Sequence, residues 1–292
     1  LTSLRSIHAP VVTTFHTILK EPSSRQERVL KEIADLSQAI IVMTMKAAEI
    51  LTTRYSISDK KIRVIPHGIP EINFIDPSYY KDQFAVEGKT VLLTFGLLSP
   101  NKGIEFAIRA LPDIVKTFPT VVYIILGQTH PNLLRAEGEN YRIGLQRLAT
   151  ELGVEKHVRF HNRFVSLDDL KEFLIMADIY ITPYLTEQQI VSGTLAYSFG
   201  AGNAVISTPF WHAAELLAEG RGILVPFKDS SAISEAVIKL LSNDAERNAI
   251  RKKAFLLGKE MTWTNIVDKY KDVFIEAQIS KPASLRHRKS IE

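Results

Sequence analysis

Residues 178–209 constrain the fold of this chain more than any other stretch of its sequence. Residues 179–182 and 204–207 are short apolar runs of the kind that forms buried strands. An apolar stripe with helical spacing runs through the residues between them, and Gly202 can close that helix in the left-handed conformation. A strand, a helix and a second strand in this order predict two parallel strands joined by a right-handed crossover.

The predicted helix has a first turn that is nearly bare of side chains. Ser192 can cap this turn, and Gly193 and Thr194 are small. In a parallel sheet the start of the helix faces the crevice above the strand ends, where its N–H groups and positive dipole favour phosphate oxygens. The alternative is an ordinary strand–helix–strand unit whose Ser-Gly-Thr only caps the helix. This stretch alone does not separate the two.

The bulk composition excludes several classes of protein. With 46% apolar and 23% charged residues over 292 positions, the composition is that of folded globular domains, and the longest apolar runs are far too short to span a bilayer. Zero cysteines exclude disulfides and thiolate metal sites, and we expect a cytoplasmic location. The 36 basic residues against 32 acidic ones suit an anionic substrate or peripheral contact with an anionic membrane surface. This excess is too slight to indicate a nucleic-acid partner.

Residues 1–70 predict part of a doubly wound α/β domain. Strands are expected at residues 10–15, 39–43 and 62–65, and helices at residues 24–36 and 46–55. Three strands make only half of such a domain, and the first residue is Leu1. We therefore expect this chain to be the later portion of a longer protein.

A second α/β series follows a linker at residues 71–88 and predicts a complete Rossmann-like domain that extends to residue 262. Its strands are expected at residues 91–95, 121–126, 157–160, 179–182, 204–207 and 222–225, and its helices near residues 104–116, 141–152, 167–176, 213–217, 231–241 and 245–257. Residues 263–292 are expected to form an amphipathic helix from Trp263 and a basic tail from Lys281. The predicted fold is α/β, with two doubly wound parallel sheets of which the first is incomplete.

The loop between the first strand and the first helix of this second series is suited to binding phosphate. Gly96 lets a ligand approach the backbone, and Lys102 stands just before the helix, where a diphosphate would lie. The alternative is a surface loop with a solvated lysine, and the loop by itself leaves both open.

The order and spacing of these motifs resemble the retaining GT-B glycosyltransferases of family four over nearly all residues from 10 to 277. Three segments are similar to the family's donor side: Gly96…Lys102-Gly103 to the diphosphate loop, Val158-Arg-Phe-His-Asn-Arg163 to the strand and loop beside the donor's base, and Asp178…Pro183 to the strand before the donor-sugar loop. Three others are similar to its first domain and C-terminal segment: Phe15-His16-Thr17 to the segment whose histidine meets the transferred sugar, Pro66-His-Gly-Ile69 to the turn that leaves that domain, and Trp263 with its helix to the segment that crosses back.

The resemblance implies an enzyme that moves a sugar from a nucleotide-sugar donor to an acceptor with retention of configuration. The residues implied to bind the donor are Gly96, Lys102, Asn162, Arg163, Ser192, Gly193, Thr194 and Tyr197. The sequence has no Asp-x-Asp string and no clustered His and Asp ligands, so we expect a metal-independent reaction with no cofactor besides the donor. The acceptor is expected to be a carbohydrate, a lipid or a small molecule, and the sequence does not identify it.

Two departures from the family's pattern bear on activity. Leu97 stands where an arginine is usual, and Gln189 and Tyr197 stand where the family has two glutamates, which meet the donor sugar and the ribose. Glutamine and tyrosine can still hydrogen-bond a sugar, and Glu187 is close enough in sequence to replace the first glutamate. A subset of the family has a similar Gln-x-x-Ser-Gly-Thr-Leu-Ala-Tyr string. Together with His16, the histidine that the resemblance implies to meet the transferred sugar, Glu187 and Gln189 are the implied catalytic residues.

Three functions stay open on the sequence alone. The first is the glycosyltransferase, the second a GT-B protein that binds nucleotide or sugar without turnover, and the third an epimerase or phosphorylase on the same scaffold. For His16 the alternative is a strand-end histidine bound to the backbone, while His130, His161 and His212 can border the site or only line and cap it. We expect the 292-residue chain alone to be inactive or nearly so.

Overall fold

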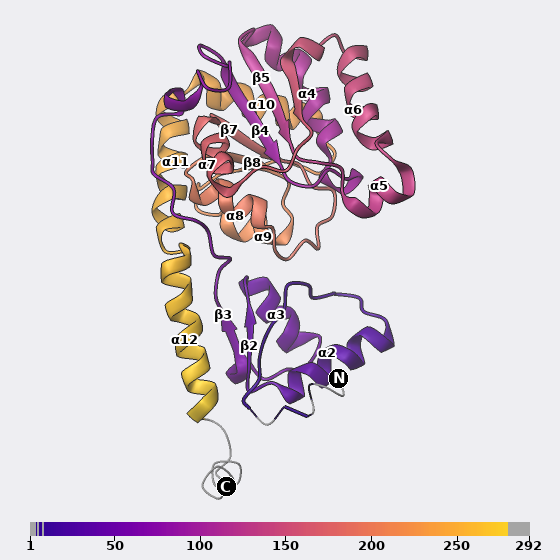
Figure 1. Cartoon of the computed structure of the whole chain (residues 1–292), viewed down its shortest axis with the longest axis vertical. Coiled ribbons are helices and arrows are strands. Elements are labelled where there is room, and N and C mark those ends of the chain that lie inside the picture. Colours follow the sequence, from indigo (N-terminus) through magenta and orange to yellow (C-terminus); the bar gives the residue numbers. More distant parts are fainter. Residues whose placement is uncertain (1–3, 5, 8, 280–292) are drawn as a thin grey trace, which may run out of the picture. The chain divides into compact units, whose positions relative to one another are not determined.

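The computed structural model describes residues 4, 6–7 and 9–279, so the basic tail predicted from Lys281 lies outside the described residues. The chain divides into two compact units (Figure 1). Of the described residues, those up to 68, those from 188 to 191 and those from 261 to 279 belong to the smaller unit, and residues 69–187 and 192–260 form the larger unit. None of the described helices is both long enough and apolar enough to cross a bilayer.

The smaller unit is built on a parallel sheet of three strands in the order β1-β2-β3. Its elements are β1 (Val12–Thr14), α2 (Ser24–Leu36), β2 (Ala39–Val42), α3 (Met45–Thr53), the 3-10 turn η1 (Asp59–Lys61) and β3 (Ile62–Val64). Helix α2 begins where the sequence predicts because Ser23 and Gln26 form a capping box, in which each side chain accepts a hydrogen bond from the other residue's backbone N–H.

Helix α12 (Trp263–Ile279) packs on the sheet of the smaller unit. Its Ile266 and Val273 are buried in one cluster with Ala39, Ile41 and Ile65. Burying each large apolar side chain contributes roughly 1.5–3 kcal/mol, so this cluster is enough to hold the helix on the sheet.

The larger unit contains a parallel sheet of six strands in the order β6-β5-β4-β7-β8-β9. The strands are β4 (Thr90–Phe95), β5 (Val121–Leu126), β6 (Val158–His161), β7 (Ile179–Thr182), β8 (Ala204–Ser207) and β9 (Ile223–Leu224). Every neighbouring pair is parallel. The predicted α/β class with two parallel Rossmann-like sheets is confirmed.

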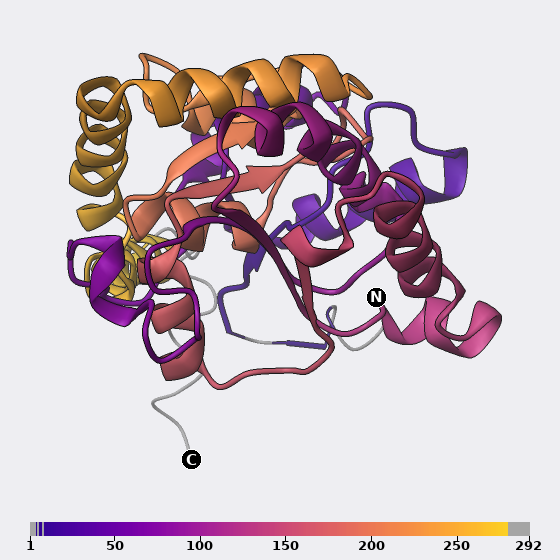
Figure 2. The same cartoon turned by 90° about the horizontal axis from the view of Figure 1, so that it is seen from above.

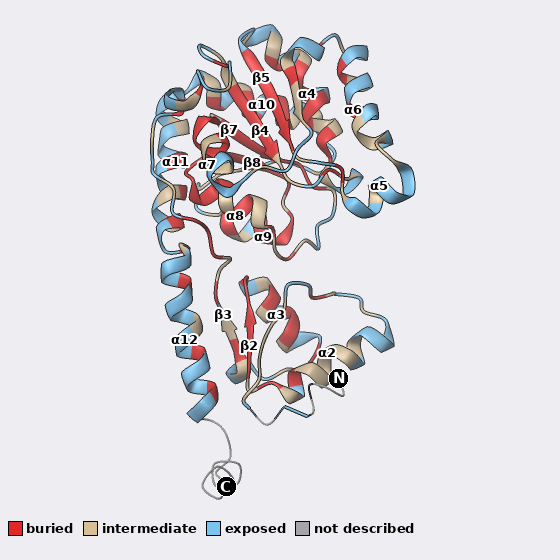
Figure 3. Ribbon diagram, in the orientation of Figure 1, coloured by how far each residue is buried: buried red, intermediate tan, exposed pale blue. Residues whose placement is uncertain are grey.

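Helices cover both faces of this second sheet (Figures 1 and 2). The helices of the larger unit are α4 (Ile104–Thr117), α5 (Pro131–Glu137), α6 (Asn140–Glu151), α7 (Leu167–Met176), α8 (Gly193–Gly200), α9 (Trp211–Leu216), α10 (Ser230–Ser242) and α11 (Asp244–Lys259), with 3-10 turns η2 (Pro77–Tyr80), η3 (Pro100–Lys102) and η4 (Glu155–His157). Helices α4, α6 and α10 share one apolar cluster with alternate residues of the strands, such as Leu92 and Ile125. On the other face α7 and α8 supply the fully buried Phe173 and Phe199. Figure 3 shows the strands as the buried centre of the unit.

Two segments differ from the sequence prediction. Residues 131–137 form helix α5, although the sequence analysis expected no helix between the strand at residues 121–126 and the helix near residues 141–152. His130 caps this helix, because its Nδ1 atom accepts a hydrogen bond from Asn132 N at 3.2 Å, and Pro131 suits the first helical position. Within the predicted linker, residues 77–80 form η2, after which Lys81 Nζ donates a hydrogen bond to Asp178, the residue before β7. Both segments depend on hydrogen bonds of polar side chains, which the pattern of apolar residues does not predict.

Candidate functional site

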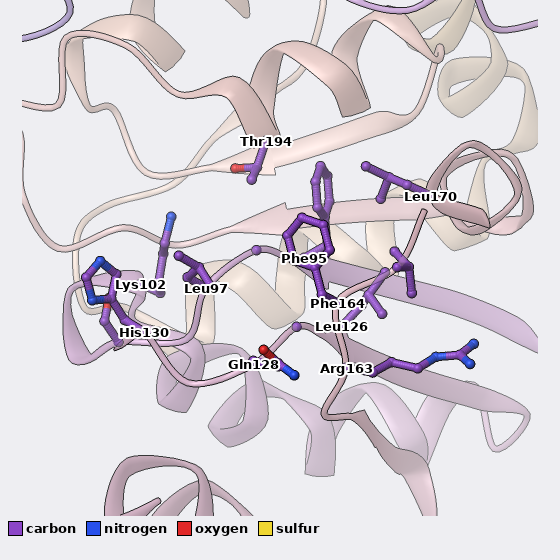
Figure 4. Close-up of a pocket in the computed structure, with 14 residues that line it drawn as sticks. Phe95, Leu97, Lys102, Leu126, Gln128, His130, Arg163, Phe164, Leu170 and Thr194 are labelled. Carbon is purple, nitrogen blue, oxygen red and sulfur yellow. The ribbon is translucent and has the colours of Figure 1, made fainter. Parts of the chain in front are cut away.

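The strand order of the larger unit changes direction between β4 and β7, which are neighbours in the sheet. In an open parallel sheet, ligands bind outside the carboxyl ends of the strands at such a point. A cavity of about 450 Å³ opens there, lined by the loops after β4, β5 and β6 and by residues of α7 and α8 (Figure 4). All of its lining residues belong to the larger unit.

The floor of the cavity is formed by two glycines that bring three segments of backbone together. Gly96 has φ +123° and Gly127 has φ +138°, backbone conformations that side chains other than glycine rarely adopt. A Cβ atom on Gly127 would lie 2.0 Å from the Gly96 carbonyl oxygen, and a Cβ atom on Gly96 would lie 3.0 Å from Thr194 Cγ2. The loop after β4 therefore lies directly against the first turn of α8.

The first turn of α8 is fixed from both sides. The Ser192 hydroxyl caps the helix by accepting a hydrogen bond from Leu195 N at 3.3 Å. The backbone N–H of Ser192 donates to Nδ1 of the buried His212 at 2.8 Å. The first N–H groups of a helix have no acceptor within it and carry the positive end of its dipole, so this turn presents a partial positive charge beside the cavity.

Lys102 adds a full positive charge at the same place. It ends η3, and its Nζ atom donates a hydrogen bond of 2.5 Å to the Tyr184 hydroxyl. That hydroxyl is also 2.8 Å from Thr194 Oγ1. Burial raises the pKa of the Tyr184 phenol, but the Lys102 ammonium and the hydrogen bonds to the hydroxyl outweigh burial and hold the pKa below its usual value. An ammonium, a hydroxyl cluster and a helix start thus converge at one end of the cavity.

Away from Lys102 the lining of the cavity is mostly apolar. Phe95, Leu126, Phe164 and Leu170 line it, together with the polar side chains of Gln128 and Arg163, whereas Leu97 and His130 lie on the side of Lys102 (Figure 4). Phe164 is 84% exposed, so a large aromatic surface is left available to a ligand at the rim. An apolar cavity with few polar groups and a cationic end suits a ligand that has a flat, partly apolar portion and an anionic portion.

The structure brings some of the residues implied by the resemblance together and leaves others elsewhere. Gly96, Lys102, Arg163 and Thr194 line the cavity, and Ser192 and Gly193 adjoin Thr194. The Asn162 amide donates to Glu139 Oε1 at 3.3 Å, Tyr197 lies half-buried on α8, and Glu187 is exposed in the loop after β7. His16 and Gln189 belong to the smaller unit, where His16 is exposed after β1 and Gln189 donates to Val191 O at 2.6 Å.

The remaining histidines have distinct surroundings. His130 lines the cavity and caps α5, and His212 accepts from the backbone of Ser192. His161 lies edge-on to Phe173, with the ring centroids 5.3 Å apart. Burial and then the nearby Arg163 lower the pKa of His161, so the neutral ring is favoured.

Sequence reasoning missed two residues of the site. Tyr184 was not singled out, although it directly follows Pro183, the last residue of a segment that resembles the family. Phe164 was not singled out either, although it directly follows Arg163. Their one sequence signal was position, because both follow predicted strand ends where ligand-binding loops concentrate. Within the described part of the chain, no group of three or more His, Asp or Glu side chains is placed to hold a metal ion.

Comparison with curated proteins finds mannosyltransferases. The chain is 27% identical over 250 residues to the phosphatidyl-myo-inositol mannosyltransferase of Mycolicibacterium smegmatis, an alignment that covers 84% of this chain and 59% of that protein. It is 28% identical over 189 residues to the GDP-mannose-dependent alpha-(1-6)-phosphatidylinositol monomannoside mannosyltransferase of the same organism, covering 61% of this chain and 47% of that protein. The chain thus spans about three-fifths or less of the length of these relatives.

Comparison with solved structures supports the fold. The HepE protein of Anabaena, solved with UDP and glucose, superposes with a TM-score of 0.76 at 20% identity over 93% of this chain and 72% of that one. Sucrose-phosphate synthase of Thermosynechococcus elongatus superposes with a TM-score of 0.75 at 18% identity over 92% of this chain and 68% of that one. The model of Glycosyltransferase Family 4 matches residues 1–71. The model of Glycosyl transferases group 1 matches residues 77–256, more than half of the chain and all of the cavity's lining, and the chain is therefore a member of the group 1 glycosyl transferases.

Proposed function

We propose that the whole protein transfers a sugar from a nucleoside-diphosphate donor to an acceptor, with retention of configuration and without a metal ion. One observation carries this proposal. The Lys102 ammonium, the Thr194 hydroxyl and the first turn of α8 converge at the cationic end of a cavity whose lining away from Lys102 is mostly apolar. A diphosphate suits the cationic end and a nucleobase suits the apolar lining.

The chemistry follows from the charge that develops on the leaving group. Breaking the bond between sugar and diphosphate leaves a negative charge on the departing oxygens. Fixed hydrogen-bonding groups stabilise this charge more than they stabilise the intact nucleotide sugar. Lys102 and the N–H groups of Gly193 and Thr194 would supply such hydrogen bonds in the proposed reaction. Charge stabilisation by these groups would make a metal ion unnecessary.

The comparisons narrow the donors to be tested. One relative is named as GDP-mannose-dependent, and one structural neighbour was solved with UDP and glucose. GDP-mannose and UDP-glucose are therefore the first candidates. Two relatives are named for phosphatidylinositol substrates, which makes a lipid acceptor at an anionic membrane surface, reached from the cytoplasm, the first acceptor class to test.

The catalytic roles proposed for His16, Glu187 and Gln189 rest on the resemblance. His16→Ala is expected to leave nucleotide affinity unchanged, because His16 lies outside the cavity-bearing unit, and to slow sugar transfer. If this variant transferred sugar at the wild-type rate, His16 would have no catalytic role and would be only a residue at the end of β1.

The decisive experiment incubates the full-length protein with each nucleotide sugar, with and without acceptor, in the presence of a chelator. A new glycoside with the donor's anomeric configuration supports the proposal. The second candidate is a protein that binds nucleotide without turnover, and it is favoured by Leu97 in the diphosphate loop and by Gln189 and Tyr197 in place of acids. Nucleotide binding without release of nucleoside diphosphate, with any acceptor tested, would favour that candidate.

A further inference from the structure

We propose that Tyr184 is a positioning residue, whose hydroxyl holds the Lys102 ammonium and the Thr194 hydroxyl together and so arranges them for a diphosphate before one binds. This inference rests on the proposed function, since it concerns the same end of the cavity. Tyr184 follows β7, whereas Lys102 follows β4 and Thr194 lies in the first turn of α8, so one hydroxyl connects three segments.

The ring of Tyr184 is held rigidly. It is 3% exposed and stacks on Phe210, with the ring centroids 4.9 Å apart and the planes 16° from parallel. The Lys102 Nζ atom lies 4.0 Å from the Tyr184 ring centroid and 2.5 Å from its oxygen. A lysine side chain loses substantial rotamer entropy when it is ordered, and here a buried phenol has already imposed that order before any ligand binds.

The sequence of the diphosphate loop makes this ordering consequential. Between Gly96 and Gly103, Lys102 is the only charged residue, because Leu97 stands where the resembling family has an arginine. A single ammonium on a flexible stem makes a weaker anchor than two fixed cations. Fixing its position recovers part of the affinity that a second cation would supply.

The backbones of the two loops are joined independently of the phenol. Leu185 N donates to Asn101 O at 3.0 Å, and a Cβ atom on Gly103 would lie 2.1 Å from the Pro183 carbonyl oxygen. Removing only the Tyr184 hydroxyl therefore leaves the loops in place and frees the ammonium. Tyr184→Phe tests the hydroxyl without dismantling the site.

Ionisation of the phenol gives the role a distinctive pH dependence. The titratable groups that face Tyr184 are Lys102, Tyr180 on β7, and His212 on α9, which reaches it through Ser192. The pKa of Tyr184 is depressed, whereas burial raises the pKa of Tyr180 well above its usual value, so Tyr184 ionises first. A tyrosinate would neutralise Lys102 and repel a diphosphate. Nucleotide affinity should accordingly fall as pH rises through the pKa of Tyr184.

The first arm of the test needs no ligand. Tyrosinate absorption is followed during alkaline titration of the wild type, Tyr184→Phe and Lys102→Met. We expect the wild type to contain a phenol that titrates below the usual 10.0, which disappears in Tyr184→Phe and moves upward in Lys102→Met. Identical titration curves for the three proteins would overturn the coupling of Lys102 to Tyr184.

The second arm measures UDP and GDP affinity by calorimetry at neutral and alkaline pH. Tyr184→Phe is expected to bind about 5- to 10-fold more weakly than the wild type at neutral pH, the effect of losing a typical hydrogen bond, and to lose the alkaline decrease. Tyr123→Phe is the matched control, because Tyr123 is equally buried and its hydroxyl bonds to Thr94 Oγ1 at 2.7 Å, away from Lys102. It should keep the wild-type affinity and pH profile.

The outcomes separate the positioning role from the proposed function. Wild-type affinity and pH profile in Tyr184→Phe would overturn the role of Tyr184 and leave the proposed function standing. A wild type that binds neither nucleotide, yet shows the expected tyrosinate titration, would overturn the proposed function while confirming the link between Lys102 and Tyr184. Thermal unfolding of Tyr184→Phe and Tyr123→Phe checks that both variants fold.

Discussion

Gly96 lies so close to Thr194 that a Cβ atom on the glycine would stand 3.0 Å from the threonine Cγ2 methyl. The loop after β4 and the start of α8 are separated in the sequence by nearly 100 residues, yet they meet at the point where the sheet changes direction. A diphosphate placed here would contact both, because the glycine leaves the backbone uncovered.

Gly96→Ala is expected to weaken nucleotide binding by roughly tenfold or more, since a methyl group must push the loop away from Thr194. It should also lower the unfolding free energy by about 1–3 kcal/mol, because alanine rarely adopts φ +123°. Gly138→Ala is the control: Gly138 also has positive φ, but no atom lies within 4 Å of its Cβ position. Calorimetry should show the binding loss for Gly96→Ala alone.

Lys102→Ala is expected to weaken UDP or GDP binding by roughly 1.5–3 kcal/mol, or about 10- to 100-fold, because a charge-assisted hydrogen bond to phosphate is lost. Lys116→Ala removes the same charge from the exposed last turn of α4 and should leave affinity unchanged. Equal affinity losses in both variants would reduce the role of Lys102 to long-range attraction.

The fold was largely predictable because its elements have strong local signals. The run Val121–Leu126 is apolar throughout and forms β5, and the capping box of Ser23 and Gln26 starts α2 at the predicted residue, Ser24. Helix α5 was missed because it has seven residues and no buried one, so no apolar stripe marks it. Its existence depends on the cap by His130 and the preset backbone of Pro131.

The candidate site was predictable only where a residue's role follows from its immediate neighbours. Glycine loops and helix caps have short signatures, which singled out Gly96 and Lys102, now seen to line the cavity, and Ser192, which caps α8. The role of Tyr184 depends on a hydrogen bond from Lys102, 82 positions earlier in the sequence. The Pro183-Tyr184 dipeptide contains no signal that predicts this bond. Asn162 bonds to Glu139, a partner that sequence spacing could not have assigned.

Asp178→Ala is expected to lower the unfolding free energy by about 3–5 kcal/mol, because it strands a nearly buried ammonium. Asp178 Oδ2 accepts from Lys81 Nζ at 2.7 Å and from Val91 N at 2.7 Å, with the two side chains 12% and 10% exposed. Lys81→Met combined with Asp178→Ala should cost less than the sum of the single changes, since no charge is left unpaired. Additive losses in denaturant unfolding would show that the ion pair does not couple the two residues.

Glu27 should make the smaller unit sensitive to acid. Hydrogen bonds from Arg54 and then Lys31 lower the pKa of Glu27 from 4.5 to about 2. A depressed folded-state pKa contributes stability that is present above pH 4.5 and is lost as pH falls towards 2. As the pH falls from 4.5 towards 2, the thermal unfolding midpoint of Glu27→Gln should therefore decrease less than that of the wild type. High salt should diminish the difference between the two proteins, because the ion pairs of Glu27 are solvent-accessible and therefore screened. The same pH dependence of unfolding in Glu27→Gln and the wild type would refute the acid sensitivity assigned to Glu27.

Gly68→Ala is expected to destabilise the smaller unit, because a Cβ atom on Gly68 would lie 2.3 Å from Cε3 of Trp263. Displacing the indole from the turn after β3 should cost roughly 1–3 kcal/mol. Trp263→Ala removes the obstacle, so Gly68→Ala should have almost no further effect in that background. Gly144→Ala, in the middle of α6 with no atom within 4 Å of its Cβ position, should instead stabilise the chain by up to about 1 kcal/mol. If Gly68→Ala is equally costly with and without the indole, the strain lies in the backbone of the turn and the contact with α12 is not its cause.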